Sequence, residues 1–179
     1  MSKDYLPQTA FSRRVDSVIR LVGDGLSYIW LALLCVIVFN VLLRYALNEG
    51  RIELEEIQWH LYSIGFLLGL SYAYQADAHI RVDILHEQFG PELRAWIELY
   101  GISLFLLPFI ALIILYGIPF TVAAWELGEI SASPGGLAYR WLIKAMLPLG
   151  FGLLLATVIA RVHRLWHFLF LEEAKHGSE

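Results

Sequence analysis

Charged residues and cysteine are scarce in this sequence of 179 residues. Charged side chains make up 17% of the chain, whereas soluble proteins have about 25%. The single cysteine, Cys35, excludes an intramolecular disulfide and any zinc or iron–sulfur site that needs several cysteines. An excess of basic residues is also missing, since the net charge is −4, and this excludes a typical nucleic-acid-binding protein.

Common enzyme motifs are missing as well. The sequence has no phosphate-binding glycine loop, no H-E-x-x-H metal pair and no G-x-S-x-G nucleophile turn. Their absence removes the usual enzyme classes. Other enzyme classes stay open at this point.

Apolar residues, in contrast, are abundant: 58% of the chain is hydrophobic and the mean hydropathy is +0.60. A helix needs about 20 mostly apolar residues to cross a bilayer. Four segments meet this requirement, at about 24–45, 57–76, 96–125 and 141–162. The sequence therefore predicts an all-α integral membrane protein with one membrane domain, 1–179, and four transmembrane helices. The third segment contains Pro108 and Pro119, so we expect it to be kinked, tilted or extended beyond the membrane.

Lysine and arginine are distributed unequally between the two sides of these spans. Nine of them lie in the N-terminal segment, the second connection and the C-terminal tail, and four lie on the opposite side. Positive residues favour the cytoplasmic side, so both termini are predicted to be cytoplasmic. We therefore expect a multi-pass membrane protein. The apolar stretch from about residue 22 is too long for a cleaved signal, so we expect the first span to be retained.

Two further segments have apolar residues at helical spacing with charged residues between them. They lie at about 10–22 and 79–90. This pattern is typical of short amphipathic helices on a membrane surface, and both segments fall on the predicted cytoplasmic side.

Histidine and polar residues leave two alternatives open. Two histidines on neighbouring spans could hold haem b in an independent electron carrier, but only His60 lies clearly within a span. His163 and His167 follow the fourth span on the other side of the membrane, so haem binding requires a different topology. Few polar residues fall near the middle of any span, which argues against an ion or substrate pathway. A small homodimeric exporter is the second alternative.

The sequence resembles the small membrane subunit of TRAP (tripartite ATP-independent periplasmic) transporters over about residues 15–162. The resemblance depends on several short motifs in order: Asn40-x-x-x-Arg44-Tyr45, Glu55-Glu56 with Gln58-Trp59-His60, His79-Ile-Arg-Val-Asp83-Ile-Leu, Leu-Leu-Pro108, Trp125 with Glu129 and Ser131, Pro134-Gly-Gly-Leu137, and Trp141 with Lys144 and Pro148-x-Gly150. Ala138 and Tyr139 depart from the family's usual residues.

The resemblance implies a subunit of the bacterial inner membrane that is not an enzyme and acts as a scaffold. It implies no catalytic, substrate-binding or metal site in this chain. The large membrane subunit of such transporters is an elevator-type carrier with the sodium and substrate sites, and a periplasmic binding protein delivers an organic acid. We therefore expect both proteins and membrane lipids as partners, sodium on the large subunit, and no cofactor in this chain. The residues expected at a partner or lipid interface are Arg44, Glu55, Glu56, His79, Asp83, Glu129 and Trp141.

Overall fold

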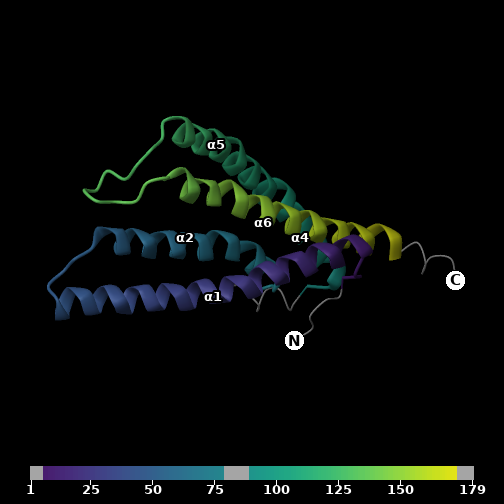
Figure 1. Cartoon of the computed structure of the whole chain (residues 1–179). Helices are drawn as coiled ribbons and strands as arrows, with labels where there is room; N and C mark the ends of the chain where they lie inside the picture. Colours follow the sequence, from purple (N-terminus) through teal and green to yellow (C-terminus); the bar gives the residue numbers. More distant parts are fainter. Residues whose placement is uncertain (1–5, 79–88, 173–179) are drawn as a thin grey trace.

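The computed structural model describes residues 6–78 and 89–172, and within them it is helical with no strand. Figure 1 shows long helices running side by side, with both described ends of the chain near one end of the bundle. The elements are α1 (Ala10–Ala46), α2 (Ile52–Gln75), α4 (Pro91–Gly101), the π-helical turn η1 (Ile102–Leu106), α5 (Leu107–Glu126), α6 (Trp141–His167) and a second π-helical turn, η2 (Phe168–Glu172). α6 is central, because it packs against α1, α2 and α5.

The first helix is continuous over 37 residues, which is about 55 Å. The side chains of Thr9 and Ser12 cap its beginning by bonding to each other's backbone N–H groups. This corrects the expectation of a separate short helix at 10–22, because no break divides that segment from the span at 24–45. Gly23, at the junction, lies against the ring of Tyr72, and the uninterrupted helix keeps this contact with α2.

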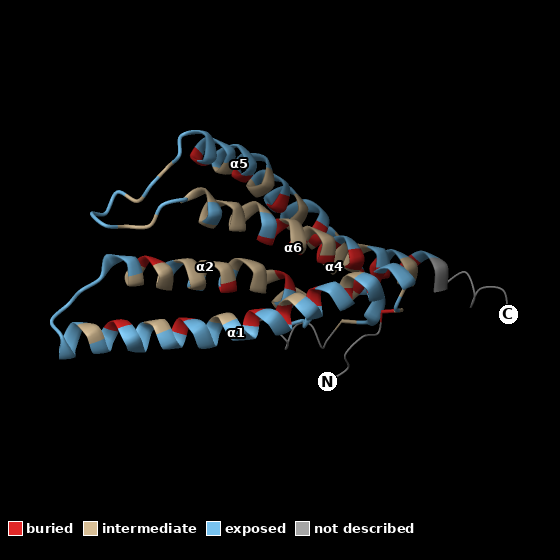
Figure 2. Cartoon of the chain, viewed as in Figure 1, coloured by how far each residue is buried: buried red, intermediate tan, exposed pale blue. Residues whose placement is uncertain are grey.

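One narrow line of residues on α1 faces the rest of the protein. Its buried members are separated by three, four or seven residues: Ser12, Asp16, Ile19, Gly23, Leu26, Leu33 and Asn40. A repeat of 3.5 residues is the pattern of left-handed helix packing, in which a single seam faces the partner helix. Much of the remaining surface of α1 is exposed, as Figure 2 shows, and many of its exposed residues are apolar, Leu31 and Leu42 among them.

The helix after the second connection runs from Pro91 to Glu126 and is longer than the expected 96–125. The π-helical turn lies directly before Pro108: the N–H of Leu107 bonds to the carbonyl of Ile102, five residues earlier. Proline has no N–H and its ring crowds the preceding turn, so a widened turn accommodates it. The expected irregularity near a proline is therefore present at Pro108. The segment predicted at 79–90 lies mostly outside the described residues.

Among residues 6–78 and 89–172, three helices are long and apolar enough to cross a membrane: Ala10–Ala46, Pro91–Glu126 and Trp141–Phe170. α2 has 24 residues, about 36 Å, and so is also long enough, but its most apolar stretch is less apolar than those of the other three. α2 packs against both α1 and α6. The second predicted span, 57–76, therefore exists as a helix, and its membrane crossing stays a prediction.

Close packing between α2 and α6 depends on Gly150. A Cβ at this position would lie 2.6 Å from the backbone oxygen of Leu67, whereas a Cβ at Gly152 would meet nothing within 4 Å. We expect Gly150→Ala to lower the free energy of unfolding by about 1–3 kcal/mol, because the two backbones must separate. The control Gly152→Ala, on the same helix, should be neutral or slightly stabilising because alanine favours helix. Unfolding in mixed micelles measures both, and equal effects would contradict this account.

Candidate functional site

Glu56, in the first turns of α2, holds the connection between α5 and α6. Glu56 is 8% exposed. Its carboxylate accepts a hydrogen bond from the Ser131 hydroxyl and another, of 2.6 Å, from the Leu137 N–H. The guanidinium of Arg140 lies 3.9 Å from the same carboxylate. We call Glu56, Ser131, Leu137 and Arg140 the Glu56 cluster. It joins two parts of the chain that are about eighty residues apart in sequence.

The backbone of residues 127–140 is shaped to surround this carboxylate. Gly135 has a φ of +78°, which favours glycine. At Gly136 a Cβ would lie 2.8 Å from the Glu56 carboxylate, so a larger residue would push the loop away. The loop also bonds to itself, from Ser131 N–H to the Leu137 carbonyl at 3.1 Å. The Pro-Gly-Gly break seen in the sequence is therefore an ordered loop.

Further contacts fasten the same end of the molecule. Lys144 pairs with Glu129, and its ammonium lies 4.0 Å from the centre of the Phe120 ring. The rings of Trp125 and Trp141 meet edge to face, 4.5 Å apart. Trp125 lies in the last turn of α5, and Trp141 is the first residue of α6.

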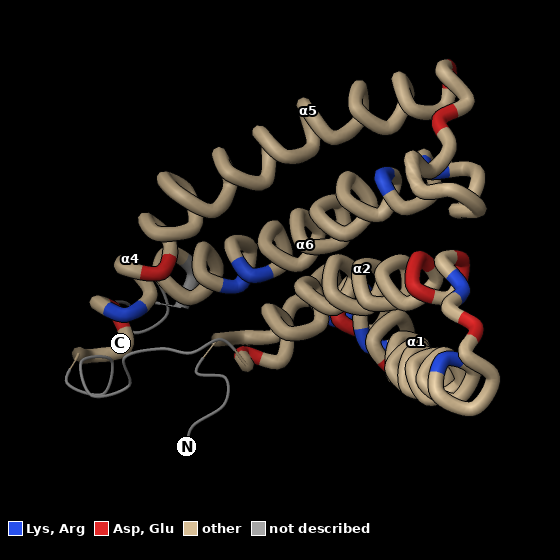
Figure 3. Tube along the Cα trace, turned by 90° about the vertical axis from the view of Figure 1, so that its left-hand side faces the viewer, with Lys and Arg blue, Asp and Glu red and all other residues tan. Residues whose placement is uncertain are grey.

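Arg44, near the end of α1, forms an ion pair with Glu55 of α2. Both side chains remain about half exposed, at 52% and 42%. Figure 3 shows acidic and basic positions gathered where α1 joins α2 and where α5 joins α6, beyond long stretches without charge.

Five of the residues predicted at an interface therefore come together at one end of the bundle: Arg44, Glu55, Glu56, Glu129 and Trp141. Glu56 and Glu129 are used within the chain, to hold the loop at 127–140. Arg44 and Glu55 are the more accessible pair. His79 and Asp83 lie outside the described residues.

Sequence reasoning missed a second set of ion pairs, near the C-terminal end of α6. Arg161 and Glu98 form two parallel hydrogen bonds of 2.7 and 3.0 Å, which tie α6 to α4. Arg164 lies 3.6 Å from Asp16 of α1, and both are buried. In the sequence Arg161 and Arg164 count only as positive charges near the cytoplasm. Their position in an apolar helix, opposite acids in other apolar helices, is the signal that indicates pairing.

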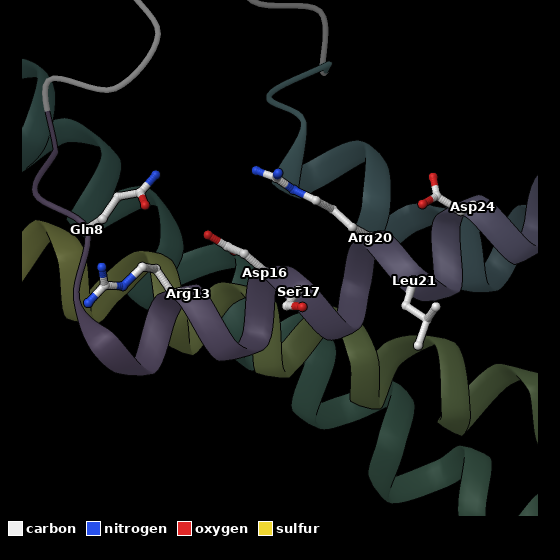
Figure 4. Close-up of a pocket in the computed structure, with 7 residues that line it drawn as sticks. All are labelled: Gln8, Arg13, Asp16, Ser17, Arg20, Leu21 and Asp24. Atoms are coloured by element: carbon white, nitrogen blue, oxygen red, sulfur yellow. The ribbon is translucent and has the colours of Figure 1, made fainter.

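Asp16 also borders a surface pocket of about 510 Å³ on the first turns of α1. Figure 4 shows it between Arg13 and Arg20, with Gln8 and Asp24 at the two ends of the pocket. The amide of Gln75 donates to the Asp16 backbone carbonyl at 2.8 Å. Asp16, in the segment predicted at 10–22, therefore contacts both α2 and α6.

The described histidines lie on two helices, His60 on α2 and the neighbours His163 and His167 on α6. The ring of His60 contacts the Glu56 carbonyl at 2.6 Å, near the beginning of α2. His163 packs against Phe11, and His167 is one turn further along α6. Within residues 6–78 and 89–172, no three histidine, cysteine, aspartate or glutamate side chains group as metal ligands would.

The hydrogen bonds to Glu56 also affect its ionisation. Donation by Ser131 and Leu137 lowers the pKa of Glu56, which precedes the apolar span, below its ordinary value. The stabilisation by this carboxylate is therefore complete above the ordinary carboxyl pKa. It is lost as the pH falls through the lowered pKa of the folded state.

Glu56→Gln should loosen the loop at 127–140, because a neutral amide replaces the carboxylate that accepts two hydrogen bonds. We expect faster hydrogen exchange at the Leu137 amide, measured in detergent at neutral pH. The control is Glu53→Gln, an exposed glutamate one turn earlier. Unchanged exchange at Leu137 in Glu56→Gln would refute the role of the Glu56 cluster.

The Arg161–Glu98 pair offers a double-mutant test. Replacing either residue alone by leucine should cost on the order of 3–5 kcal/mol, because a buried charge is left without its partner. The double variant Glu98→Leu/Arg161→Leu should be less destabilised than either single variant. Unfolding in mixed micelles checks this, and additive effects would contradict a direct pair.

Comparison with known proteins agrees with the family expected from the motifs. Residues 33–168 match the family described as "Tripartite ATP-independent periplasmic transporters, DctQ component". The chain is also 30% identical over 146 residues to a TRAP transporter small permease protein of Haemophilus influenzae. That alignment covers 81% of this chain and 88% of the relative. This chain therefore belongs to the DctQ family, the small, non-catalytic permease components of TRAP transporters.

Proposed function

We propose that the chain is a rigid scaffold for the large membrane subunit of a sodium-coupled TRAP transporter. The tripartite architecture implies the other components as partners. The observation behind the proposal is that the buried polar residues contact other helices of this chain. The Glu56 cluster and the ion pairs of α6 join helices of this chain to one another, whereas α1 and α5 carry long exposed apolar faces.

Rigidity suits such a role, because an elevator-type carrier needs a stationary body against which to move. Ionic contacts fasten this chain near both ends of α6: Lys144 at one end, and Arg161 and Arg164 at the other. Close packing at Gly150 joins α6 to α2 between them. Helices fastened at several levels resist sliding past one another.

The proposed placement has four helices crossing the bacterial inner membrane and both termini in the cytoplasm. Shielding of α2 by α1 and α6 favours its crossing, because fewer of its polar residues face lipid. α1, about 55 Å long, exceeds the roughly 30 Å hydrocarbon core, so its first turns extend to the cytoplasmic surface. Arg13 and Arg20 there meet lipid headgroups.

The remaining parts of the proposal concern the partners. The large subunit holds sodium and the substrate, this chain holds no cofactor, and a periplasmic binding protein delivers an organic acid. Exposed apolar residues on α5, such as Leu115 and Tyr116, and on α1, such as Leu31, supply surfaces for the large subunit and for lipid.

The first test is to tag this chain, extract it from its native membrane in mild detergent and identify what purifies with it. We expect a stoichiometric and much larger hydrophobic protein, and organic-acid uptake that requires both chains. A coloured protein with a Soret band would instead support the haem b carrier. Transport by this chain reconstituted alone would support the exporter.

Two matched variants test which helix forms the interface with the large subunit. Leu31→Trp on α1 and Leu115→Trp on α5 each enlarge an exposed apolar residue without adding charge. A face against lipid tolerates the larger ring, whereas a packed interface does not. We expect one variant to lose the large subunit and the other to keep it. If both variants still bind the large subunit, neither of these faces forms the interface.

A further inference from the structure

A groove between α1 and α2 ends at the Arg44–Glu55 pair. Its volume is about 300 Å³, and its lining includes Asn40, Arg44, Tyr45, Glu55, Gln58 and Trp59. It lies at the far end of α1 from Asp16, at the surface that the proposed orientation turns to the periplasm. We propose that this groove binds the headgroup of a phospholipid with a primary ammonium, phosphatidylethanolamine.

The floor of the groove is polar, although apolar helices surround it. Asn40 is 7% exposed, and among the described residues its Oδ1 has no hydrogen-bond partner. The Nε2 of Gln58, on the facing helix, is also buried without a partner in the same part of the chain. Buried polar atoms without partners are costly, so two on one groove floor indicate a ligand that hydrogen-bonds there.

The mouth of the groove carries one charge of each sign. Arg44 has five N–H donors and Glu55 has four acceptor sites, so their mutual contact leaves most of this capacity unused. A phosphate accepts from the guanidinium of Arg44, and a primary ammonium donates to the carboxylate of Glu55. A zwitterionic headgroup therefore matches both charges, and the ion pair need not separate.

The two polar layers are arranged as in a phospholipid. Asn40 lies one helical turn below Arg44, about 6 Å deeper along α1, and Gln58 lies about 4.5 Å beyond Glu55 along α2. In a phospholipid the ester carbonyls likewise lie below the phosphate, and one of them accepts a hydrogen bond from the unpaired Nε2 of Gln58. Ile37 and Val41 continue the groove with partly exposed apolar surface for an acyl chain.

Aromatic residues at the mouth support a membrane-interface position. Tyr45 is 80% and Trp59 is 71% exposed, and both line the groove. Tyrosine and tryptophan are favoured at the level of lipid headgroups, because they combine an apolar ring with a polar group. A lipid matches the charged mouth, the Gln58 amide and the apolar continuation together.

The test compares lipids of equal acyl chains on the full-length purified protein, with native mass spectrometry as the readout. We expect retention of phosphatidylethanolamine over phosphatidylcholine, which cannot donate to Glu55, and over phosphatidylglycerol, which has no ammonium. Equal retention of the three lipids would overturn the proposal. Cross-linking of Gln58→Cys to a partner protein, with no lipid retained, would also overturn it.

Single variants test which residue contacts which part of the lipid headgroup. Glu55→Gln should reduce retention of phosphatidylethanolamine about tenfold and leave phosphatidylcholine unchanged, because one charge-assisted hydrogen bond is lost. Arg44→Gln should weaken all three lipids. The control is Arg51→Gln, which removes an exposed charge that pairs with Glu49 outside the groove lining. It should leave retention unchanged, and an effect equal to that of Arg44→Gln would overturn the assignment.

Gln58→Leu separates a lipid site from a structural one. It removes a buried Nε2 without a described partner, so the unfolding temperature in detergent should not fall, whereas lipid retention should. Unchanged retention would refute the role of Gln58. The inference rests on the proposed placement of α1 and α2 in the bilayer. It does not depend on the large subunit, because co-purification tests that partner separately and lipid retention tests this groove.

Discussion

A buried polar side chain in apolar surroundings needs a partner, and the arrangement of this protein depends on how that need is met. The Glu56 carboxylate meets it with donors from the loop at 127–140, and Glu98 meets it with Arg161 of α6. Each contact joins helices that are distant in the sequence. The polar residues of this small membrane protein therefore fix which helices are neighbours, whereas the apolar residues are mostly left to face outward.

The division is clearest on α1. A single seam with a 3.5-residue repeat carries its inward contacts, and the rest of its surface is exposed and apolar. In a bilayer the hydrophobic effect gives little free energy for packing one apolar helix against another. Close packing and polar contacts must therefore position α1. Tyr72 against Gly23 and Asp16 beside Arg164 are contacts of these two kinds.

Sequence reasoning located the helices well, because long apolar runs and their charged boundaries are local features. It expected the fourth span to begin at Trp141, where α6 begins. It did not foresee the continuous first helix, since Gly23, Asp24 and Gly25 resemble a break until the contact with α2 is known. The Arg161–Glu98 pair could not be assigned either, because the partners are 63 residues apart and their meeting depends on how each helix is rotated.

The distance along the chain between Glu56 and its partners has a consequence for biosynthesis. Leu137 follows Glu56 by 81 residues, which a ribosome adds in roughly 4–16 seconds. During that interval α1 and α2 have been synthesised, but the acid on α2 still lacks the loop that will surround it. The loop can close over this carboxylate only after Leu137 has been synthesised, so this contact forms late, when most of the chain already exists.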